Sequence, residues 1–201
     1  MKELTLPPAL AAELAEIYVE LQAEYERVAA EIPLSCAGCP DNCCDSWFFH
    51  HTYCEWAYLW QGLRRLSGEE LTRLVKRAED YIRQSQAQFA AGKRPQVLCP
   101  LNEAGLCILY EHRLLICRMH GIPAMLTRPD GKTLRFPGCF RCQDIVHACA
   151  EAGPAMDRTQ LFTRLADLEN RLLGGNRQRY PKVKKTIAEM IVQGPPAASV
   201  I

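Results

Sequence analysis

Four cysteines within nine residues constrain this chain more than any other feature of its sequence. They lie in the segment Cys36-Ala-Gly-Cys39-Pro-Asp-Asn-Cys43-Cys44, whose Gly, Pro, Asp and Asn residues favour turns. Thiolates are soft ligands that select zinc or iron–sulfur clusters, and a gap of two residues lets a turn direct both sulfurs at one centre. The segment therefore predicts a metal-binding loop.

The cysteine count argues against a disulfide framework, because eleven is an odd number. The first thirty residues are rich in glutamate and lack the pattern of a signal peptide, and no apolar run reaches the length of a membrane span. We therefore expect a cytoplasmic protein that does not enter the membrane, in which thiols stay reduced and clustered cysteines serve metals or redox chemistry. The net charge of +1 provides no general attraction to nucleic acid.

Helical periodicity dominates the chain of 201 residues outside the cysteine blocks. The predicted fold is mainly α, a helical domain with a small cysteine-rich metal-binding subregion that contains a short antiparallel β-hairpin. We expect one cysteine-cluster domain over residues 1–194, with its metal-binding region at 36–142. An N-terminal helix over 8–32 and C-terminal helices within 157–193 would pack on that region, and residues 195–201 are expected to form a frayed tail.

Local signals place several further elements. Seven aromatic residues within the fourteen residues 47–60 predict an aromatic helix, which would either exclude water from a metal cluster or simply form core. Ser67 and Glu70 match a capping box that begins a long helix. The turn Arg128-Pro129-Asp130-Gly131 predicts a hairpin between residues 124–127 and 132–136. Asp157 can cap the next helix.

A second group of cysteines lies between residues 97 and 142, about fifty-five residues after the first. Because the intervening sequence is helical, the simplest expectation is that the two blocks converge on a shared site. Adjacent side chains such as those of Cys43 and Cys44 point in different directions, so one mononuclear centre would use only one of them. This favours two metals, a polynuclear cluster or one idle thiol. The predicted ligands are Cys36, Cys39, Cys43, Cys44, Cys99, Cys107, Cys117, Cys139 and Cys142.

Other residues near these blocks are weaker candidates. Cys54 is an isolated thiol that we leave outside the ligand set. Cys149 would share a helical face with Cys142, whereas His147 would point away from it, and His120 is the better imidazole candidate although a surface histidine is the default. Three arginines could offset the charge of several thiolates or simply face solvent. They are Arg113, Arg118 and Arg141.

Two alternatives to metal binding use the same thiols. A Cys-x-x-Cys pair of the thioredoxin kind expects a preceding strand and a following helix in a βαβ unit, whereas the flanks here are predicted to be helical. A catalytic cysteine with a histidine partner would not explain so many clustered thiols. The count and spacing therefore favour metal binding.

The cysteine pattern resembles the YkgJ-type cysteine-cluster proteins, described as zinc- or iron-chelating domains with the pattern CxxCxxxCC. The resemblance covers residues 36 to about 142 and rests on the first block, on Cys99-Pro100-Leu101, on Gly105 to Tyr110, and on Arg113 with Cys117-Arg118. The chain departs from that family where Leu114 follows Arg113 in place of proline. The resemblance implies a chelated zinc or iron–sulfur centre. Some members are described as iron–sulfur oxidoreductases and one branch as flagellin lysine N-methylases.

Two functions are consistent with these observations. The first is an iron–sulfur protein with an electron-transfer or oxidoreductase-associated role and a protein or redox partner, favoured by more thiols than one zinc ion needs. The second is a non-enzymatic, zinc-stabilised binding or adaptor module. No catalytic residue is identified, and no glycine-rich nucleotide-binding motif is present. A basic cluster predicts a solvated helix start more readily than a nucleic-acid site. It comprises Arg177, Arg179, Lys182, Lys184 and Lys185.

Overall fold

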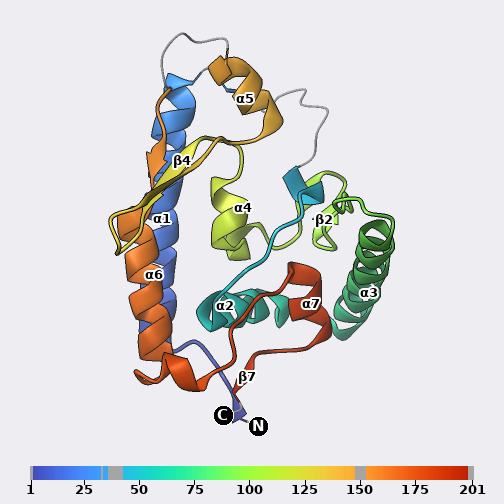
Figure 1. Cartoon of the computed structure of the whole chain (residues 1–201). Helices are drawn as coiled ribbons and strands as arrows, with labels where there is room; N and C mark the ends of the chain where they lie inside the picture. Colours follow the sequence, from blue (N-terminus) through green and yellow to red (C-terminus); the bar gives the residue numbers. More distant parts are fainter. Residues whose placement is uncertain (1, 33, 36–42, 148–152, 199–201) are drawn as a thin grey trace. The chain divides into compact units, whose positions relative to one another are not determined.

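The computed structural model of the chain describes residues 2–32, 34–35, 43–147 and 153–198. Over these residues the fold is mainly α with small sheets, as predicted (Figure 1). The α-helices are α1 (Pro8–Glu31), α2 (Tyr53–Leu63), α3 (Gly68–Ala90), α4 (Leu115–Met119), α5 (Phe140–His147), α6 (Thr159–Leu172) and α7 (Ile187–Val192). Short 3-10 helices are η1 (Cys43–Asp45), η2 (Tyr110–His112) and η3 (Arg177–Arg179). None of these helices combines the length and the apolarity that crossing a membrane requires.

The strands are short and form three small sheets. They are β1 (Lys2–Glu3), β2 (Asn102–Glu103), β3 (Leu106–Cys107), β4 (Ala124–Thr127), β5 (Thr133–Phe136), β6 (Met156–Asp157) and β7 (Ala197–Ala198). β1 pairs with β7, β2 pairs with β3, and β4 lies between β5 and β6.

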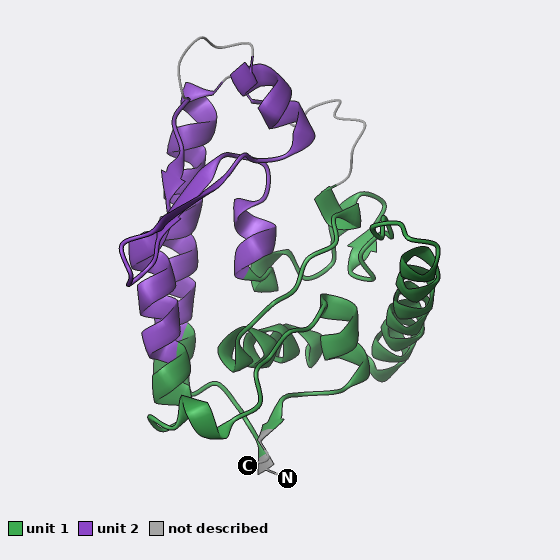
Figure 2. Ribbon diagram, in the orientation of Figure 1, with its two compact units in different colours: residues 1–11, 41–114, 169–201 green, residues 12–40, 115–168 purple. Residues whose placement is uncertain are grey.

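The chain divides into two compact units, coloured separately in Figure 2. The first unit comprises residues 1–11, 41–114 and 169–201, and the second comprises 12–40 and 115–168. Each unit is built from segments that are far apart in sequence. The prediction of a single domain over residues 1–194 stays a prediction.

In the second unit, α1 follows the predicted helical period and ends just before Pro33. Its apolar stripe is buried at Leu14, Ile17, Leu21 and Val28. An ion pair of 2.6 Å between Arg164 of α6 and Glu20 of α1 joins these two helices, which run side by side in Figure 1. The burial of this stripe is the main source of stability for α1, because propensity alone contributes little.

The predicted hairpin is present in the second unit as β4 and β5, and the register pairs Ala124 with Phe136. Gly131 has a φ of +81°, a conformation that glycine adopts without steric cost. The parallel pairing of β6 with β4 was not predicted. A strand of two residues is too short to produce a periodic sequence signal.

In the first unit, α2 packs against α7 and α7 packs against α3. The indole Nε1 atoms of Trp56 and Trp60 both donate to the carbonyl oxygen of Met190, at 3.1 Å and 3.0 Å. Leu59 of α2 and Leu74 of α3 are also buried in this unit. The two tryptophans of α2 therefore anchor α7, which is the core role that the sequence left open.

The predicted helix over residues 47–60 is wrong in its first half, because α2 begins only at Tyr53. Residue His50 instead forms an antiparallel bridge with Lys185, with main-chain hydrogen bonds of 2.7 Å and 3.1 Å. Thr52 is extended and its side chain accepts a hydrogen bond from the amide of Glu55, which caps α2. Pairing with a distant segment and a local cap together set the start of the helix.

The predicted frayed tail, residues 195–201, is corrected over residues 195–198, and residues 199–201 lie outside the described residues. Ala197–Ala198 pairs with Lys2–Glu3, and the amide of Leu4 donates to the carbonyl oxygen of Pro196 at 2.8 Å. Pro196 is buried. Main-chain pairing and burial order this segment, whose composition resembles that of a loose terminus.

Candidate metal centre

One described residue of the first cysteine block, Cys44, contacts Cys99 of the second block within the first unit. The main-chain amide of Cys99 donates a hydrogen bond of 2.8 Å to the carbonyl oxygen of Cys44. Cys44 belongs to the short helix η1, together with the exposed Cys43. The sequence expectation that the two blocks converge in space is therefore met at these two residues.

The hairpin of β2 and β3 brings Cys107 to the same region. The amide of Asn102 donates to the carbonyl oxygen of Cys99 at 2.9 Å, and Asn102 is the register partner of Cys107. The turn between the strands uses Ala104 at φ +50°, in the left-handed region that costs a residue with a Cβ about 1 kcal/mol or more. Side-chain Oδ1 of Asn102 accepts from the amide of Gly105 at 3.1 Å, which supports this turn.

The three thiols influence one another electrostatically. The pKa of Cys99 is raised to about 12, mainly by burial and to a smaller extent by nearby Cys44 and Cys107, whereas the main chain at Leu101 and the cation of Arg77 oppose the shift. A thiol with this pKa keeps its proton at neutral pH. Because metals bind the thiolate, metal binding at Cys99 would have to release that proton.

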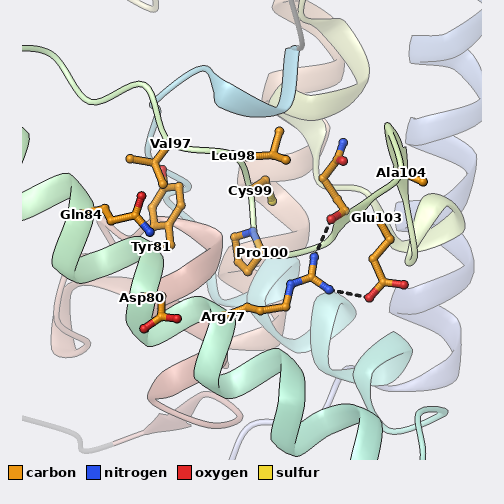
Figure 3. Close-up of a pocket in the computed structure, with 11 residues that line it drawn as sticks. Arg77, Asp80, Tyr81, Gln84, Val97, Leu98, Cys99, Pro100, Glu103 and Ala104 are labelled. Atoms are coloured by element: carbon orange, nitrogen blue, oxygen red, sulfur yellow. Dashed lines mark hydrogen bonds and ion pairs between the residues drawn. The ribbon is translucent and has the colours of Figure 1, made fainter.

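A pocket of about 460 Å³ opens beside Cys99 (Figure 3). Side chains of α3 line one side, including Arg77 and Tyr81, and the segment 97–104 lines the other. Arg77 donates to the carboxylate of Glu103 and to the carbonyl oxygen of Asn102, so that it ties α3 to the hairpin. The pocket provides solvent access to the region of Cys99.

Asn102 carries an unsatisfied donor in this region. Its side chain is 5% exposed, and its Nδ2 atom has no hydrogen-bond partner in the part of the chain that the structure describes. A buried amide without a partner costs about 1–3 kcal/mol. Asn102 is the register partner of Cys107, and its main-chain amide donates to the carbonyl oxygen of Cys99. A thiolate or sulfide held at these residues is therefore a candidate acceptor for the unsatisfied Nδ2 group.

The described residues do not by themselves complete a metal site. Across residues 2–32, 34–35, 43–147 and 153–198, no three His, Cys, Asp or Glu side chains are close enough to hold a metal ion. The predicted ligands Cys36 and Cys39 lie outside the described residues. Thiols within the first unit therefore fit a metal only in part, and further donors are needed.

The remaining predicted ligands belong to the second unit. Cys117 lies in α4, Cys139 directly precedes α5, and Cys142 lies in its first turn. The pKa of Cys142 is raised to about 11, mainly by burial and to a smaller extent by Cys139. The expectation that all nine predicted ligands share one centre stays a prediction.

The residues that the sequence made weaker ligand candidates differ in how deeply they are buried. Cys54 is fully buried in α2, and burial, followed by the carboxylates of Glu169 and Glu55, raises its pKa well above the ordinary value. This environment makes an inert thiol. His120 is half-buried after α4, His147 is exposed at the end of α5, and Cys149 lies outside the described residues.

The basic residues largely pack on aromatic rings. The guanidinium of Arg113 stacks on Tyr110 at 3.8 Å and that of Arg118 stacks on Tyr18 at 4.4 Å. In the C-terminal basic cluster, three residues lie over the rings of Tyr53, Phe49 and Trp56. These are Arg177, Lys184 and Lys185. Such contacts give the cluster a structural role at the start of α2.

Sequence reasoning missed Asn102, although it follows Cys99 by three residues and precedes a glycine turn. An asparagine before Ala104-Gly105 signals a turn, but only the tertiary structure shows that its amide is buried without an acceptor. No protein-family model, curated protein or solved structure matched the chain. Function is therefore inferred from the chemistry of the site.

Proposed function

We propose that this is a metal-chelating cysteine-cluster protein that binds an iron–sulfur cluster through thiolates of the two cysteine blocks, with Cys99 and Cys107 as the ligands from the second block. Its role would be electron transfer or assistance to an oxidoreductase. The observation that supports this most is the hydrogen bond of 2.8 Å between the main chains of Cys99 and Cys44, which joins the two blocks. Their resemblance to the YkgJ-type pattern points to the same chemistry.

The proposed donor set consists of thiols alone. Cys36, Cys39, Cys44, Cys99 and Cys107 are five thiols, and Cys43 is a sixth, which is enough for a cluster as well as for a structural zinc ion with its four ligands. Iron–sulfur clusters are held by four thiolates and supply one-electron redox chemistry when bound. The unsatisfied amide of Asn102 could donate to a cluster sulfur, a contact that tunes the reduction potential.

The surface beside the thiols supports a protein redox partner. Leu98 and Leu106 each directly precede a proposed ligand, and they are 47% and 72% exposed. Apolar side chains that remain exposed beside a redox centre suit transient contact with another protein. Electron transfer would then require only a brief encounter.

A zinc-stabilised module is the second candidate, and the small size of the site favours it. Strands β2 and β3 have two residues each, and a two-stranded hairpin of this size is not stable alone. A bound zinc ion could replace the missing core at Cys99 and Cys107. A closed four-thiolate site would leave no position for catalysis.

Metal, sulfide and visible-absorption analysis of anaerobically purified protein tests both candidates. We expect a brown protein with bound iron and acid-labile sulfide. The substitutions Cys44→Ser and Cys99→Ser should remove most of the iron, because each deletes one ligand of the joined blocks. Cys54→Ala is the matched control and should keep the full iron content, because Cys54 is fully buried in α2.

The outcomes separate the candidates. A colourless protein with stoichiometric zinc that depends on Cys44 and Cys99 would replace the iron–sulfur assignment with the zinc module. Protein that binds neither metal under anaerobic conditions, or that loses it equally in the Cys54→Ala control, would contradict the metal centre altogether.

A further inference from the structure

The pair Cys139-Phe140-Arg141-Cys142 occupies a strand–turn–helix junction in the second unit. Strand β5 ends at Phe136, and α5 begins at Phe140. The carbonyl oxygen of Cys139 accepts from the amide of Gln143 at 2.9 Å, which makes Cys139 the first residue of the helical hydrogen-bond pattern. The strand predicted before this motif is present as β5, so a strand precedes the pair and a helix follows it.

The turn before the pair packs tightly against the main chain of Gly121 and against Cys142. Gly138 has a φ of +86°, and a Cβ built on it would lie 2.7 Å from the carbonyl oxygen of Gly121 and 3.2 Å from Cβ of Cys142. The amide of Cys139 donates to the same Gly121 oxygen at 3.0 Å. Only glycine fits this approach, so the main chain at residue 121 positions the start of the motif.

The two thiols differ in accessibility. Cys139 is half-buried, and Cys142 is fully buried one helical turn later. Residues three apart at the start of a helix have Cβ atoms about 5–6 Å apart, close to the separation that a disulfide requires after a small adjustment. Neither cysteine is in a disulfide in this structure.

The setting also favours Cys139 as the attacking thiol. It lies at the N-terminal end of α5 and is the more accessible of the two thiols. Phe140, the next residue in the chain, is 74% exposed and is available for contact with an incoming peptide or thiol compound.

We propose that Cys139 and Cys142 form a thiol–disulfide exchange couple that is separate from the metal centre. The Cys139 thiolate attacks one sulfur of an external disulfide, either a small molecule or a protein. That sulfur–sulfur bond breaks, a mixed disulfide with Cys139 forms, and the other sulfur leaves as a thiolate that takes a proton from water.

Cys142 then completes the exchange. Having given its proton to water, it attacks the Cys139 sulfur of the mixed disulfide, forms the Cys139–Cys142 bond and releases the second external thiol. The external disulfide is reduced to two thiols by two electrons, and the protein dithiol is oxidised to one disulfide. The reverse sequence would reduce the protein pair with external thiols.

The test uses the full chain, purified with its metal, in glutathione buffers of stepwise redox ratio. Samples are quenched with acid, alkylated and analysed by mass spectrometry of the peptide that contains both cysteines. We expect an intramolecular disulfide in wild type. Cys142→Ser should accumulate a glutathione adduct on Cys139, because the resolving thiol is missing. Cys139→Ser should react at about a tenth of the wild-type rate or below, because the remaining thiol, Cys142, is buried and inaccessible.

Three control measurements accompany the redox titration. Cys54→Ala is expected to behave as wild type in the redox titration, and circular dichroism of each variant verifies the helical fold. Metal content is measured in the double variant Cys139→Ser/Cys142→Ser and should equal that of wild type.

Three results would overturn the couple. They are the absence of a Cys139–Cys142 disulfide at every redox ratio, the absence of an adduct in a folded Cys142→Ser variant, and loss of bound metal in the double variant. The last result would assign the pair to the metal centre instead. Failure of the metal centre itself would be seen separately, as metal-free wild-type protein with an intact redox titration.

Discussion

His50 is a fully buried imidazole without a hydrogen-bond partner in the described part of the chain. It is 1% exposed, both ring nitrogens are unsatisfied, and its ring lies 5.8 Å from that of Phe48. Burial, with a smaller effect from His51, lowers its pKa from 6.5 to about 3. The neutral ring is therefore the form that the fold accommodates.

This histidine should make the stability of the protein depend on pH. Because the unfolded chain binds a proton near pH 6.5 and the folded chain only near pH 3, stability is complete above pH 6.5 and falls as the pH is lowered from there towards 3. From pH 7.5 to 5.5, His50 should account for a loss of about 1.4 kcal/mol in the free energy of unfolding. Urea denaturation at the two pH values measures this change in the free energy of unfolding.

The comparison variant is His50→Phe, which cannot bind a proton and should lose about 1.4 kcal/mol less than wild type between these pH values. Equal losses in wild type and His50→Phe would show that His50 is not buried in its neutral form.

At the scale of the elements, a carboxylate from α6 caps the start of α2. Glu169 is 4% exposed, and its two oxygens accept from the amides of Tyr53 and Cys54 at 3.0 Å and 2.9 Å. The cation of Arg177 lies 3.6 Å from the same carboxylate. A negative charge at a helix N-terminus satisfies free amides and interacts well with the helix dipole.

Removal of this charge should destabilise the fold. Glu169→Gln keeps the shape but loses the charge and one of the two acceptors, so we expect the free energy of unfolding to fall by about 2 kcal/mol. Chemical denaturation at pH 7.5 measures it. Glu79→Gln on the exposed face of α3 is the matched control and should change stability by less than about 0.5 kcal/mol. A change at Glu169 no larger than that control would exclude a capping role.

At the scale of the whole molecule, the two ends of the described chain pair with each other. β1 and β7 are antiparallel and belong to the first unit. The carbonyl oxygen of Gly194, just before the tail, accepts from Nε1 of Trp56 at 3.0 Å. The C-terminal segment therefore continues the packing of α2 and α7 into the β1–β7 pair.

Deletion of residues 195–201 tests whether the C-terminal segment contributes to stability. The truncated chain loses the hydrogen bond from Leu4 to Pro196 and the pairing of Ala197–Ala198, so its free energy of unfolding should fall by about 2 kcal/mol. Thermal unfolding followed by circular dichroism measures the loss. Deletion of residues 199–201 alone is the control and should have little effect. If both deletions are neutral, the tail is frayed, as its composition suggested.

Local patterns in the sequence determined the elements that depend on neighbouring residues. The stripe of α1 and the capping box of α3 at Ser67 were predicted, because helical period and capping act within a few residues. The hairpin of β4 and β5 was predicted from its turn. The cysteine spacing is also a local property, and the ligand set that it suggested stays a prediction.

Tertiary structure decided whatever depends on residues far apart in the chain. It paired His50 with Lys185, which ended the predicted aromatic helix early, and it brought Glu169 to the start of α2. It also placed Cys99 against Cys44 and left the amide of Asn102 without an acceptor among the described residues. The sequence by itself shows which chemical groups are present. Burial and distant partners decide which of these groups act together, because burial and long-range contacts arise only when the chain folds.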